Sequence, residues 1–357
     1  MTNANESAVR AVLESELEPY SGRPLAQLTH AVTAGRDETA VSLTLPFPAA
    51  HYASELRDRL GARLPPNTRL EIHWQVVSQG TRRPVNAIPG IRNIIAVASG
   101  KGGVGKSTTA ANLALGLAYD GASVGLLDAD IYGPSQPRMM GLPNEKPTSR
   151  DGKTFDPPVA YGVKVSSIGF LVDEEQPLIW RGPMVTQALM QLLNDSRWGE
   201  LDYLIVDMPP GTGDTQLTLS QRVPLSGAVI VTTPQDIALL DARRGLRMFE
   251  KVDVPILGIV ENMSTHICSN CGHEENIFGA GGGRAMAQQY GVELLAELPL
   301  HAQIREETDS GRPTVVAQPD GSLGRAYIDM ARRTAARLAF ASELSRPVFP
   351  KIEIEDT

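Results

Sequence analysis

Apolar and polar positions follow two different patterns along the chain, and the first pattern covers residues 1–80. Apolar residues recur at helical spacing over 9–17 and 52–64, and they alternate with polar residues over 41–45 and 70–76. Alternation is typical of a strand with one buried face, and the four-residue spacing is typical of an amphipathic helix. Residues 1–80 are therefore predicted to form a small α+β domain. We expect it to have a structural or docking role, because it holds no pattern of chemically reactive residues.

From residue 93 onward the apolar residues form short continuous runs instead. Such runs are typical of parallel strands that are buried on both faces. Helical stretches separate them, so we predict a doubly wound, mostly parallel α/β sheet over residues 93–345. The polar segment 81–92, which contains proline and glycine, is predicted to be a linker, and residues 346–357 a tail. The expected parallel strands are 94–98, 123–127, 203–207, 227–232 and 256–261.

The first of these runs ends in a glycine-rich turn that precedes a predicted helix. Residues 100–107 read Gly-Lys-Gly-Gly-Val-Gly-Lys-Ser and match the phosphate-binding loop pattern G-x-x-x-x-G-K-[ST]. In such a loop, backbone N–H groups and the helix N-terminus face a phosphate. We expect Lys106 to reach the β- and γ-phosphates of a nucleoside triphosphate, and the Ser107 hydroxyl to hold Mg²⁺.

The same glycines also fit a second pattern. Gly100, Gly102 and Gly105 satisfy the dinucleotide fingerprint G-x-G-x-x-G, and Asp128 lies at the end of the next apolar run. A dinucleotide pyrophosphate requires neither a lysine nor a magnesium-binding hydroxyl at the start of the helix. The Lys-Ser pair that follows the glycines therefore favours a nucleoside triphosphate.

Three aspartates stand at the ends of two predicted strands, where ligands of open α/β sheets bind. Asp128 and Asp130 follow the strand 123–127, and Asp207 ends the strand 203–207. A carboxylate in the position of Asp207 supports Mg²⁺ in P-loop enzymes; the alternative is a buried carboxylate that caps a turn. Residues 208–214 have the proline and glycine content of a switch loop that senses a γ-phosphate.

The composition narrows the class of protein. The 357 residues are 42% hydrophobic and 21% charged, with a formal net charge of −8. An acidic chain of this kind gives no reason to expect binding to nucleic acid or to an anionic membrane surface. No apolar run approaches the ~20 residues of a membrane helix, and residues 1–6 lack the features of a signal peptide. We expect a cytoplasmic protein.

The two cysteines form one C-x-x-C pair, Cys268 and Cys271. A C-x-x-C in a tight turn presents two thiolates to one metal ion, but two ligands do not close a tetrahedral site. His266 and His273, another part of the chain or a second copy of the protein could supply the others. A redox dithiol and inert buried thiols are the alternatives. The pair lies in a polar loop before the glycine-rich residues 279–283, which weakens the redox interpretation.

Several separated motifs resemble one protein family. Residues 99–107, with a second lysine at Lys101, are similar to the deviant Walker A loop of the MinD/ParA/NifH class. The remaining motifs resemble the Mrp/ApbC branch of that class, the ATP-binding iron–sulfur cluster carriers, and residues 6–78 resemble the MIP18-type domain often fused in front of it. These remaining motifs are residues 128–135, 180–184, 207–214 and 261–264.

The resemblance implies roles for individual residues. Lys101 would be the signature lysine, which reaches across a homodimer to the nucleotide of the other subunit. Asp130 would orient or activate the attacking water, Asp207 would support Mg²⁺, and Asn262 would contact the adenine. The implied activity is slow, switch-like ATP hydrolysis. The implied nucleotide-binding residues of the loop are Gly100, Lys101, Gly102, Gly103, Val104, Gly105, Lys106, Ser107 and Thr108.

The resemblance also implies a cargo and partners. Cys268 and Cys271 of each subunit would together bind one bridging cluster, usually [4Fe–4S] in this family. The protein would receive it from assembly scaffold proteins and transfer it to apo iron–sulfur proteins. Residues 45–48 contain no cysteine, unlike some MIP18-type domains, so we do not expect the N-terminal domain to bind the cluster. A ParA- or MinD-like positioning or scaffold protein with structural zinc is the alternative. The segment 326–344 lacks the character of a membrane-binding helix, which favours the carrier.

Overall fold

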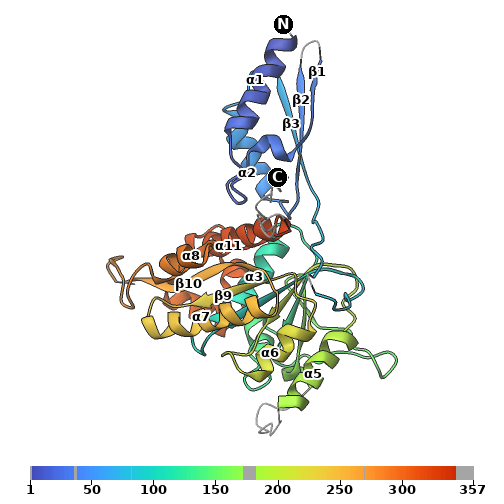
Figure 1. Cartoon of the computed structure of the whole chain (residues 1–357), viewed down its shortest axis with the longest axis vertical. Coiled ribbons are helices and arrows are strands. Elements are labelled where there is room, and N and C mark those ends of the chain that lie inside the picture. The colour runs from blue at the N-terminus through green and yellow to red at the C-terminus, as the bar shows by residue number, and fades with distance from the viewer. Residues whose placement is uncertain (1, 36–37, 82, 172–181, 269, 343–357) are drawn as a thin grey trace, which may run out of the picture.

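The structure, a computed structural model, consists of an N-terminal domain and a larger α/β domain. The N-terminal domain lies above the α/β domain in Figure 1. None of the helices in the described part of the chain has both the length and the apolar character needed to cross a bilayer. The described residues are 2–35, 38–81, 83–171, 182–268 and 270–342.

The N-terminal domain is a three-stranded sheet with helices packed against it. β2 lies in the centre, antiparallel to β1 and parallel to β3. Val41, Leu43 and Leu45 of β2 are buried and alternate with half-buried residues, which confirms the alternating pattern as a strand; β1 was not predicted. The elements are α1 (Thr2–Ser15), η1 (Leu25–Leu28), β1 (Thr29–Ala34), β2 (Thr39–Leu45), α2 (Tyr52–Gly61) and β3 (Thr68–Trp74).

The α/β domain is built on a sheet in the order β11-β10-β9-β4-β8-β5-β7-β6, with β12 also paired to β10. All of its strands are parallel to their neighbours except β6 and β11. The five predicted strands are present, whereas β7 and β12 were not predicted. The strands are β4 (Ile91–Ser99), β5 (Val124–Asp128), β6 (Val159–Ala160), β7 (Val163–Ser167), β8 (Leu201–Asp207), β9 (Gly227–Thr232), β10 (Ile256–Ile267), β11 (Glu274–Glu275) and β12 (Leu294–Leu300).

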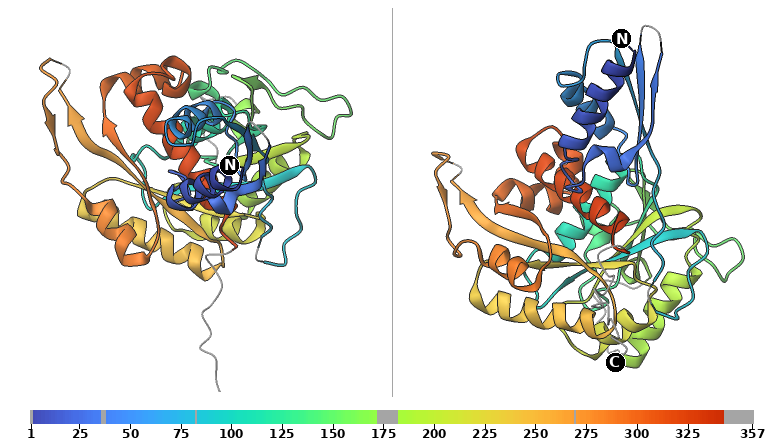
Figure 2. Two further views of the ribbon diagram at one scale, coloured as in Figure 1. Left: turned by 90° about the horizontal axis from the view of Figure 1, so that it is seen from above. Right: turned by 45° about the horizontal axis from the view of Figure 1, so that its top comes forward.

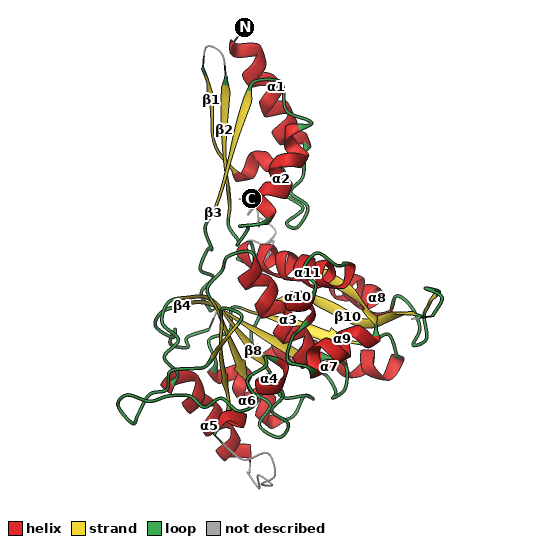
Figure 3. Ribbon diagram, turned by 180° about the vertical axis from the view of Figure 1, so that it is seen from behind, coloured by secondary structure: helices red, strands yellow, loops and turns green. Residues whose placement is uncertain are grey.

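Helices cover both faces of this sheet (Figure 3). In β4, Ile95 and Val97 pack into one core with α3 and α11, while Ile94 and Ala96 pack into a second core with α5, α6, α7 and α8. This burial on two sides confirms the doubly wound α/β fold. The helices are α3 (Lys106–Tyr119), α4 (Gln136–Met139), η2 (Ile168–Phe170), α5 (Gly182–Asp195), α6 (Asp214–Arg222), α7 (Asp236–Lys251), α8 (Gly282–Tyr290), α9 (Ala302–Asp309), α10 (Thr314–Ala317) and α11 (Ser322–Ala339).

A buried ion pair of the α/β domain also contacts the N-terminal domain. Arg332 of α11 is 2% exposed, and its Nε donates to Asp120 Oδ2 at 2.6 Å. Its other nitrogens donate to Glu55 of α2 at 3.0 Å and to the Tyr20 hydroxyl at 3.1 Å. Asp120 directly follows α3 and also accepts the backbone N–H of Tyr52 at 3.2 Å. The N-terminal domain therefore contacts the C-terminal end of α3.

The segment between β3 and β4 is also held against the α/β domain. Gln79 Nε2 donates to the carbonyl of Ala339 at 2.8 Å, and Arg83 donates to the carbonyls of Ser220 and Val223 at the end of α6. β4 begins at Ile91, inside the predicted linker 81–92. Much of this segment therefore follows a defined path along the surface.

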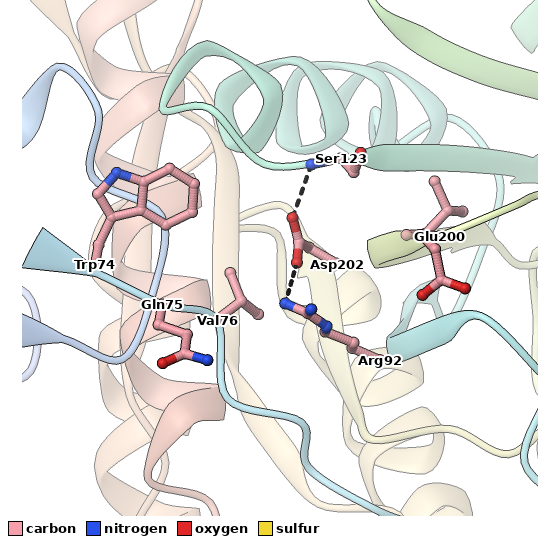
Figure 4. Close-up of a pocket in the computed structure, with 8 residues that line it drawn as sticks. Trp74, Gln75, Val76, Arg92, Ser123, Glu200 and Asp202 are labelled. Atoms are coloured by element: carbon pink, nitrogen blue, oxygen red, sulfur yellow. Dashed lines mark hydrogen bonds and ion pairs between the residues drawn. The ribbon is translucent and has the colours of Figure 1, made fainter.

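A cavity of about 390 Å³ lies at the domain junction (Figure 4). Arg92 and the backbone N–H of Ser123 both bind the carboxylate of Asp202, at 2.9 Å each. Trp74 and Glu200 are among its other lining residues. The cavity lies at the N-terminal ends of β4 and β8, opposite the end of the sheet that carries the glycine-rich loop.

Candidate nucleotide site and cysteine pair

The glycine-rich loop connects β4 to α3 as its sequence predicts. Gly103 and Gly105 have φ values of 80° and 84°, a left-handed conformation that costs other residues free energy. A Cβ on Gly100 would collide with the backbone of Asp241 at α7, so the loop is packed closely on that side. A Cβ on Gly102 would meet no atom within 4 Å. The loop is thus packed against α7 at Gly100 and has free space at Gly102, as a phosphate-binding loop requires.

Lys106, Ser107 and Asp207 lie together at the start of α3. Lys106 forms an ion pair with Asp207, and its Nζ lies 3.1 Å from the Ser107 hydroxyl. Gln136 donates from Nε2 to Asp207 Oδ2 at 2.8 Å and to the carbonyl of Ser107 at 3.0 Å. Lys106, Asp207 and Gln136 are all buried. A hydroxyl and a carboxylate are the oxygen donors that suit Mg²⁺, so this donor set fits the predicted ion.

Asp128 and Asp130 follow β5 on the same side of the sheet. Asp128 is fully buried and accepts hydrogen bonds from the backbone N–H groups of Ser135 and Gln136, both at 3.0 Å. Burial, and then the charge of Asp207, raise the pKa of Asp128. Burial also raises the pKa of Asp130, and the charge of Lys106 opposes this shift. Asp128 therefore shapes the loop that carries Asp130.

Lys101 and Asn262 are the two remaining residues to which the resemblance assigns a role. Lys101 is half-buried, its carbonyl accepts the Ser99 hydroxyl at 2.9 Å, and its ammonium forms no ion pair with any described residue. Asn262, at β10, donates from Nδ2 to the carbonyl of Val104 at 2.9 Å. Thr108 lies in the first turn of α3. Asn262 thus supports the phosphate loop directly.

The loop after Asp207 borders the same site. The Met208 N–H donates to the carbonyl of Val97 and the Gly211 N–H to that of Ser99, both at 3.0 Å, before α6 begins at Asp214. These bonds attach the predicted switch loop to β4. Of the motif at residues 180–184, Trp180 and Arg181 lie outside the described residues, and the rest begins α5.

The cysteine pair lies at the tip of the hairpin formed by β10 and β11, which projects from one edge of the domain (Figure 2). The Cys268 N–H donates to the carbonyl of His273 at 2.9 Å, and the Gly272 N–H to that of Cys268 at 2.8 Å. Cys268 is half-buried and Cys271 exposed. Among the described residues no three His, Cys, Asp or Glu side chains are grouped to hold a metal ion. In this arrangement His266 and His273 are not grouped with the two cysteines.

β10 links this pair to the phosphate loop. Asn262 lies within β10 and Cys268 directly follows its last residue, six positions further on, which corresponds to at most about 20 Å of extended chain. Between them Met263 has a φ of 58°, and the pairing with β12 shifts register. Glu261, beside Asn262, is buried and accepts the Gly283 N–H at the start of α8; burial raises its pKa. Strained backbone of this kind is concentrated at functional sites.

The sequence analysis predicted no role for two residues of the site. Gln136 binds both Asp207 and the phosphate loop, and Glu261 anchors α8 to β10. Each is next to a motif or within one, but the residue type of a glutamine or a glutamate does not predict which distant residue it will bind.

Comparisons with known proteins agree with this geometry. The matching family model is described as the NUBPL iron-transfer P-loop NTPase of the ParA group, and it covers residues 90–335. The iron–sulfur cluster carrier protein of Haemophilus influenzae is 49% identical over 345 residues, 95% of this chain and 93% of the relative. The iron–sulfur cluster transfer protein NUBPL of Mus musculus is 52% identical over 271 residues, 75% of this chain and 84% of the relative.

A solved structure is similar as well. The nucleotide-binding protein of Archaeoglobus fulgidus in complex with ADP is 40% identical, with a TM-score of 0.56, and the match covers 62% of this chain and 88% of that chain. The chain, with its phosphate loop, its nearby aspartates and its cysteine pair, therefore belongs to the Mrp/ApbC/NUBPL family of iron-transfer P-loop NTPases.

Proposed function

We propose that the protein is an ATP-hydrolysing carrier that binds an iron–sulfur cluster at a homodimer interface and transfers it to apoproteins. One observation carries the proposal: β10 holds Asn262 against the phosphate loop, and the cysteine pair, half-buried at Cys268 and exposed at Cys271, follows directly after this strand. The names of its relatives, which are iron–sulfur cluster carrier and transfer proteins, favour this function over a ParA- or MinD-like scaffold.

The nucleotide chemistry rests on the buried group around Lys106. The backbone of residues 100–105 and Lys106 would bind the phosphates of ATP, and Ser107 and Asp207 would hold Mg²⁺, which stabilises negative charge on the phosphates. Lys106 must then exchange its ion pair with Asp207 for the phosphates. Asp130 would orient the attacking water. Hydrolysis at such a site serves as a switch and is slow.

The cluster is the cargo of the protein. Two cysteines in each chain cannot close a cluster site with four thiolates, so a two-fold dimer that joins two hairpin tips is the simplest source of the other pair. A cluster held there would be accessible to solvent and to a recipient protein. A [4Fe–4S] cluster is the type we propose. Scaffold proteins would supply it, and apo iron–sulfur proteins would accept it.

The cluster is tested by anaerobic reconstitution with iron and sulfide, followed by absorption spectroscopy and metal analysis. We expect uptake of iron and sulfide in equal amounts, loss of uptake in Cys268→Ser and Cys271→Ser, and its retention in the matched controls His266→Ala and His273→Ala. The loaded protein should activate an apo iron–sulfur enzyme. Stoichiometric zinc that resists exchange for iron, with no activation, would contradict the carrier function.

The nucleotide site is tested separately. Wild-type protein should bind MgATP and hydrolyse it slowly, and Lys106→Ala should lose nearly all turnover. If Lys101 acts across the dimer, a heterodimer of Lys101→Ala and Asp130→Asn subunits gathers both lesions in one site and leaves the other active. Verified heterodimers without activity would show that Lys101 acts within its own subunit.

A further inference from the structure

A basic groove runs between α6 and α7, next to the predicted switch loop. It has a volume of about 450 Å³, and its lining contains four cations and no carboxylate. A concentration of positive charge is notable in a chain with a formal net charge of −8. The residues of the basic groove are Thr212, Leu217, Arg243, Arg244, Arg247, Met248 and Lys251.

The cations follow one face of α7. Arg243, Arg247 and Lys251 are each four residues apart, so they line about 12 Å of helix surface. Arg244 and Arg247 have surface partners, Asp241 at 3.1 Å and Glu250 at 3.0 Å, but exposed pairs of this kind contribute little and exchange readily.

Two of the cations lack such a partner. Arg243 and Lys251 form no ion pair with any residue that the structure describes, and Arg243 Nε is buried without a hydrogen-bond acceptor. Leu217 and Met248 add an apolar lining to the groove. The lining therefore suits a segment that carries both apolar side chains and several carboxylates.

The C-terminal end of the sequence contains a segment of this composition, residues 352–356, which reads Ile-Glu-Ile-Glu-Asp. It lies outside the described residues, which end at Ser342. It offers three carboxylates to the cations and two isoleucines to the apolar lining. Charge and hydrophobicity are thus complementary between this segment and the basic groove.

The distance is compatible with a contact inside one molecule. The carbonyl of Ala339 binds Gln79, and Arg83 binds the end of α6 at Ser220. Gln79 and Arg83 are four positions apart, at most about 14 Å of backbone, and Leu217 lies about 5 Å further along α6. The twelve residues from Ser342 to residue 354 span up to about 40 Å, about twice the sum of these two stretches.

We propose that residues 352–356 dock in the basic groove of their own chain. Because Thr212 belongs both to the groove and to the loop after Asp207, the docked segment lies against the predicted switch loop. The contact is independent of cluster binding and of ATP hydrolysis, so it can be tested without either activity.

The test is photo-crosslinking in the full chain. Benzoylphenylalanine is introduced at residue 354, an equal mixture of isotopically light and heavy protein is irradiated, and the adducts are mapped by mass spectrometry. We expect adducts on Leu217 or Met248 within one molecule. The yield should fall at least fivefold between 50 and 500 mM NaCl, because the Debye length shortens to about 4 Å.

Charge reversal supplies the control. Lys251→Glu should reduce the adduct at least fivefold, while Arg57→Glu, an equal reversal at an exposed cation of α2, should leave it unchanged. Replacing both Glu353 and Glu355 by lysine in otherwise wild-type protein should abolish the adduct, because the segment would then carry a net positive charge opposite four cations. Adducts elsewhere, yields insensitive to Lys251→Glu, or adducts that join light to heavy protein would overturn the proposal; the last would assign the groove to a second copy.

Discussion

Replacing Arg332 by methionine should destabilise the α/β domain and weaken its contact with the N-terminal domain. The guanidinium is buried and serves three partners at once: Asp120 at the end of α3, Glu55 of α2 and the Tyr20 hydroxyl. Methionine fills much of the same volume but pairs with none of them. The carboxylate of Asp120, 1% exposed, would then keep backbone donors such as the Tyr52 N–H and, at 4.0 Å, the ring nitrogen of His51.

The expected loss of unfolding free energy in each variant follows from how deeply the partner of Arg332 is buried. Removing one member of a buried ion pair costs about 3–5 kcal/mol, because the other charge remains buried and unpaired. Glu55 is different: its side chain is 42% exposed, so Glu55→Gln should cost about 1 kcal/mol or less. In the double variant Asp120→Asn/Arg332→Met the orphan charge is absent, so its loss should be smaller than the sum of the single losses by about 0.5–3 kcal/mol.

Urea unfolding measures the three variants, and limited proteolysis of the segment between β3 and β4 reports detachment. Arg332→Met should unfold at lower urea and be cleaved faster in native buffer, while Glu55→Gln should resemble wild type in both assays. Trp74, at the junction cavity, gives a fluorescence signal for the same event. A loss below about 1 kcal/mol in Arg332→Met, or equal losses in Arg332→Met and Glu55→Gln, would refute the argument from burial.

Three further predictions concern the nucleotide site and β10. Met263→Gly should be more stable than Met263→Ala by roughly 0.5–1 kcal/mol in urea unfolding, because only glycine relieves the positive φ; equal midpoints would contradict this. Gln136→Leu should raise the Mg²⁺ concentration for half-maximal ATP hydrolysis about tenfold, since Asp207 loses a neutral donor, and an unchanged value would exclude that role. Burial raises the pKa of Glu261 in the folded protein, so its contribution to stability is present below the ordinary pKa of glutamate and is lost as pH rises through the pKa of the folded state. The stability of Glu261→Gln relative to wild type should therefore increase between pH 5 and 8. A constant difference in stability would contradict a buried carboxylate at Glu261.

Local patterns were sufficient for most of the large sheet. The strand before the phosphate loop has apolar side chains on both faces, and Ile94 and Ile95 do enter different cores. β7 was missed because Lys164 and two serines interrupt its apolar run, and β12 because Glu297 and Pro299 do so. In both strands, pairing with a neighbour outweighs a weak local pattern.

Contacts between distant residues could not be predicted in the same way. The motifs place Lys106 and Asp207 at one site, since each has a recognisable position at a strand end or helix start. Gln136 reaches the same site from a four-residue helix, and Arg332 meets Asp120 across 212 residues of sequence. Nothing in a glutamine or an arginine specifies its partner, so these contacts depend on the packing of whole elements.

Helix α3 connects the phosphate loop to the contact with the N-terminal domain, so binding at one end can affect binding at the other. Its first residue is Lys106, and Asp120, which holds the N-terminal domain, follows its last. Fourteen residues form a rod about 21 Å long, so a tilt of about 5° at one end displaces the other by about 2 Å. If a partner of the N-terminal domain binds one orientation of this helix more tightly than the other, that partner and a ligand that tilts the helix change each other's affinity by the same factor. A partner of that domain would therefore act as an effector of the nucleotide, and the nucleotide as an effector of the partner.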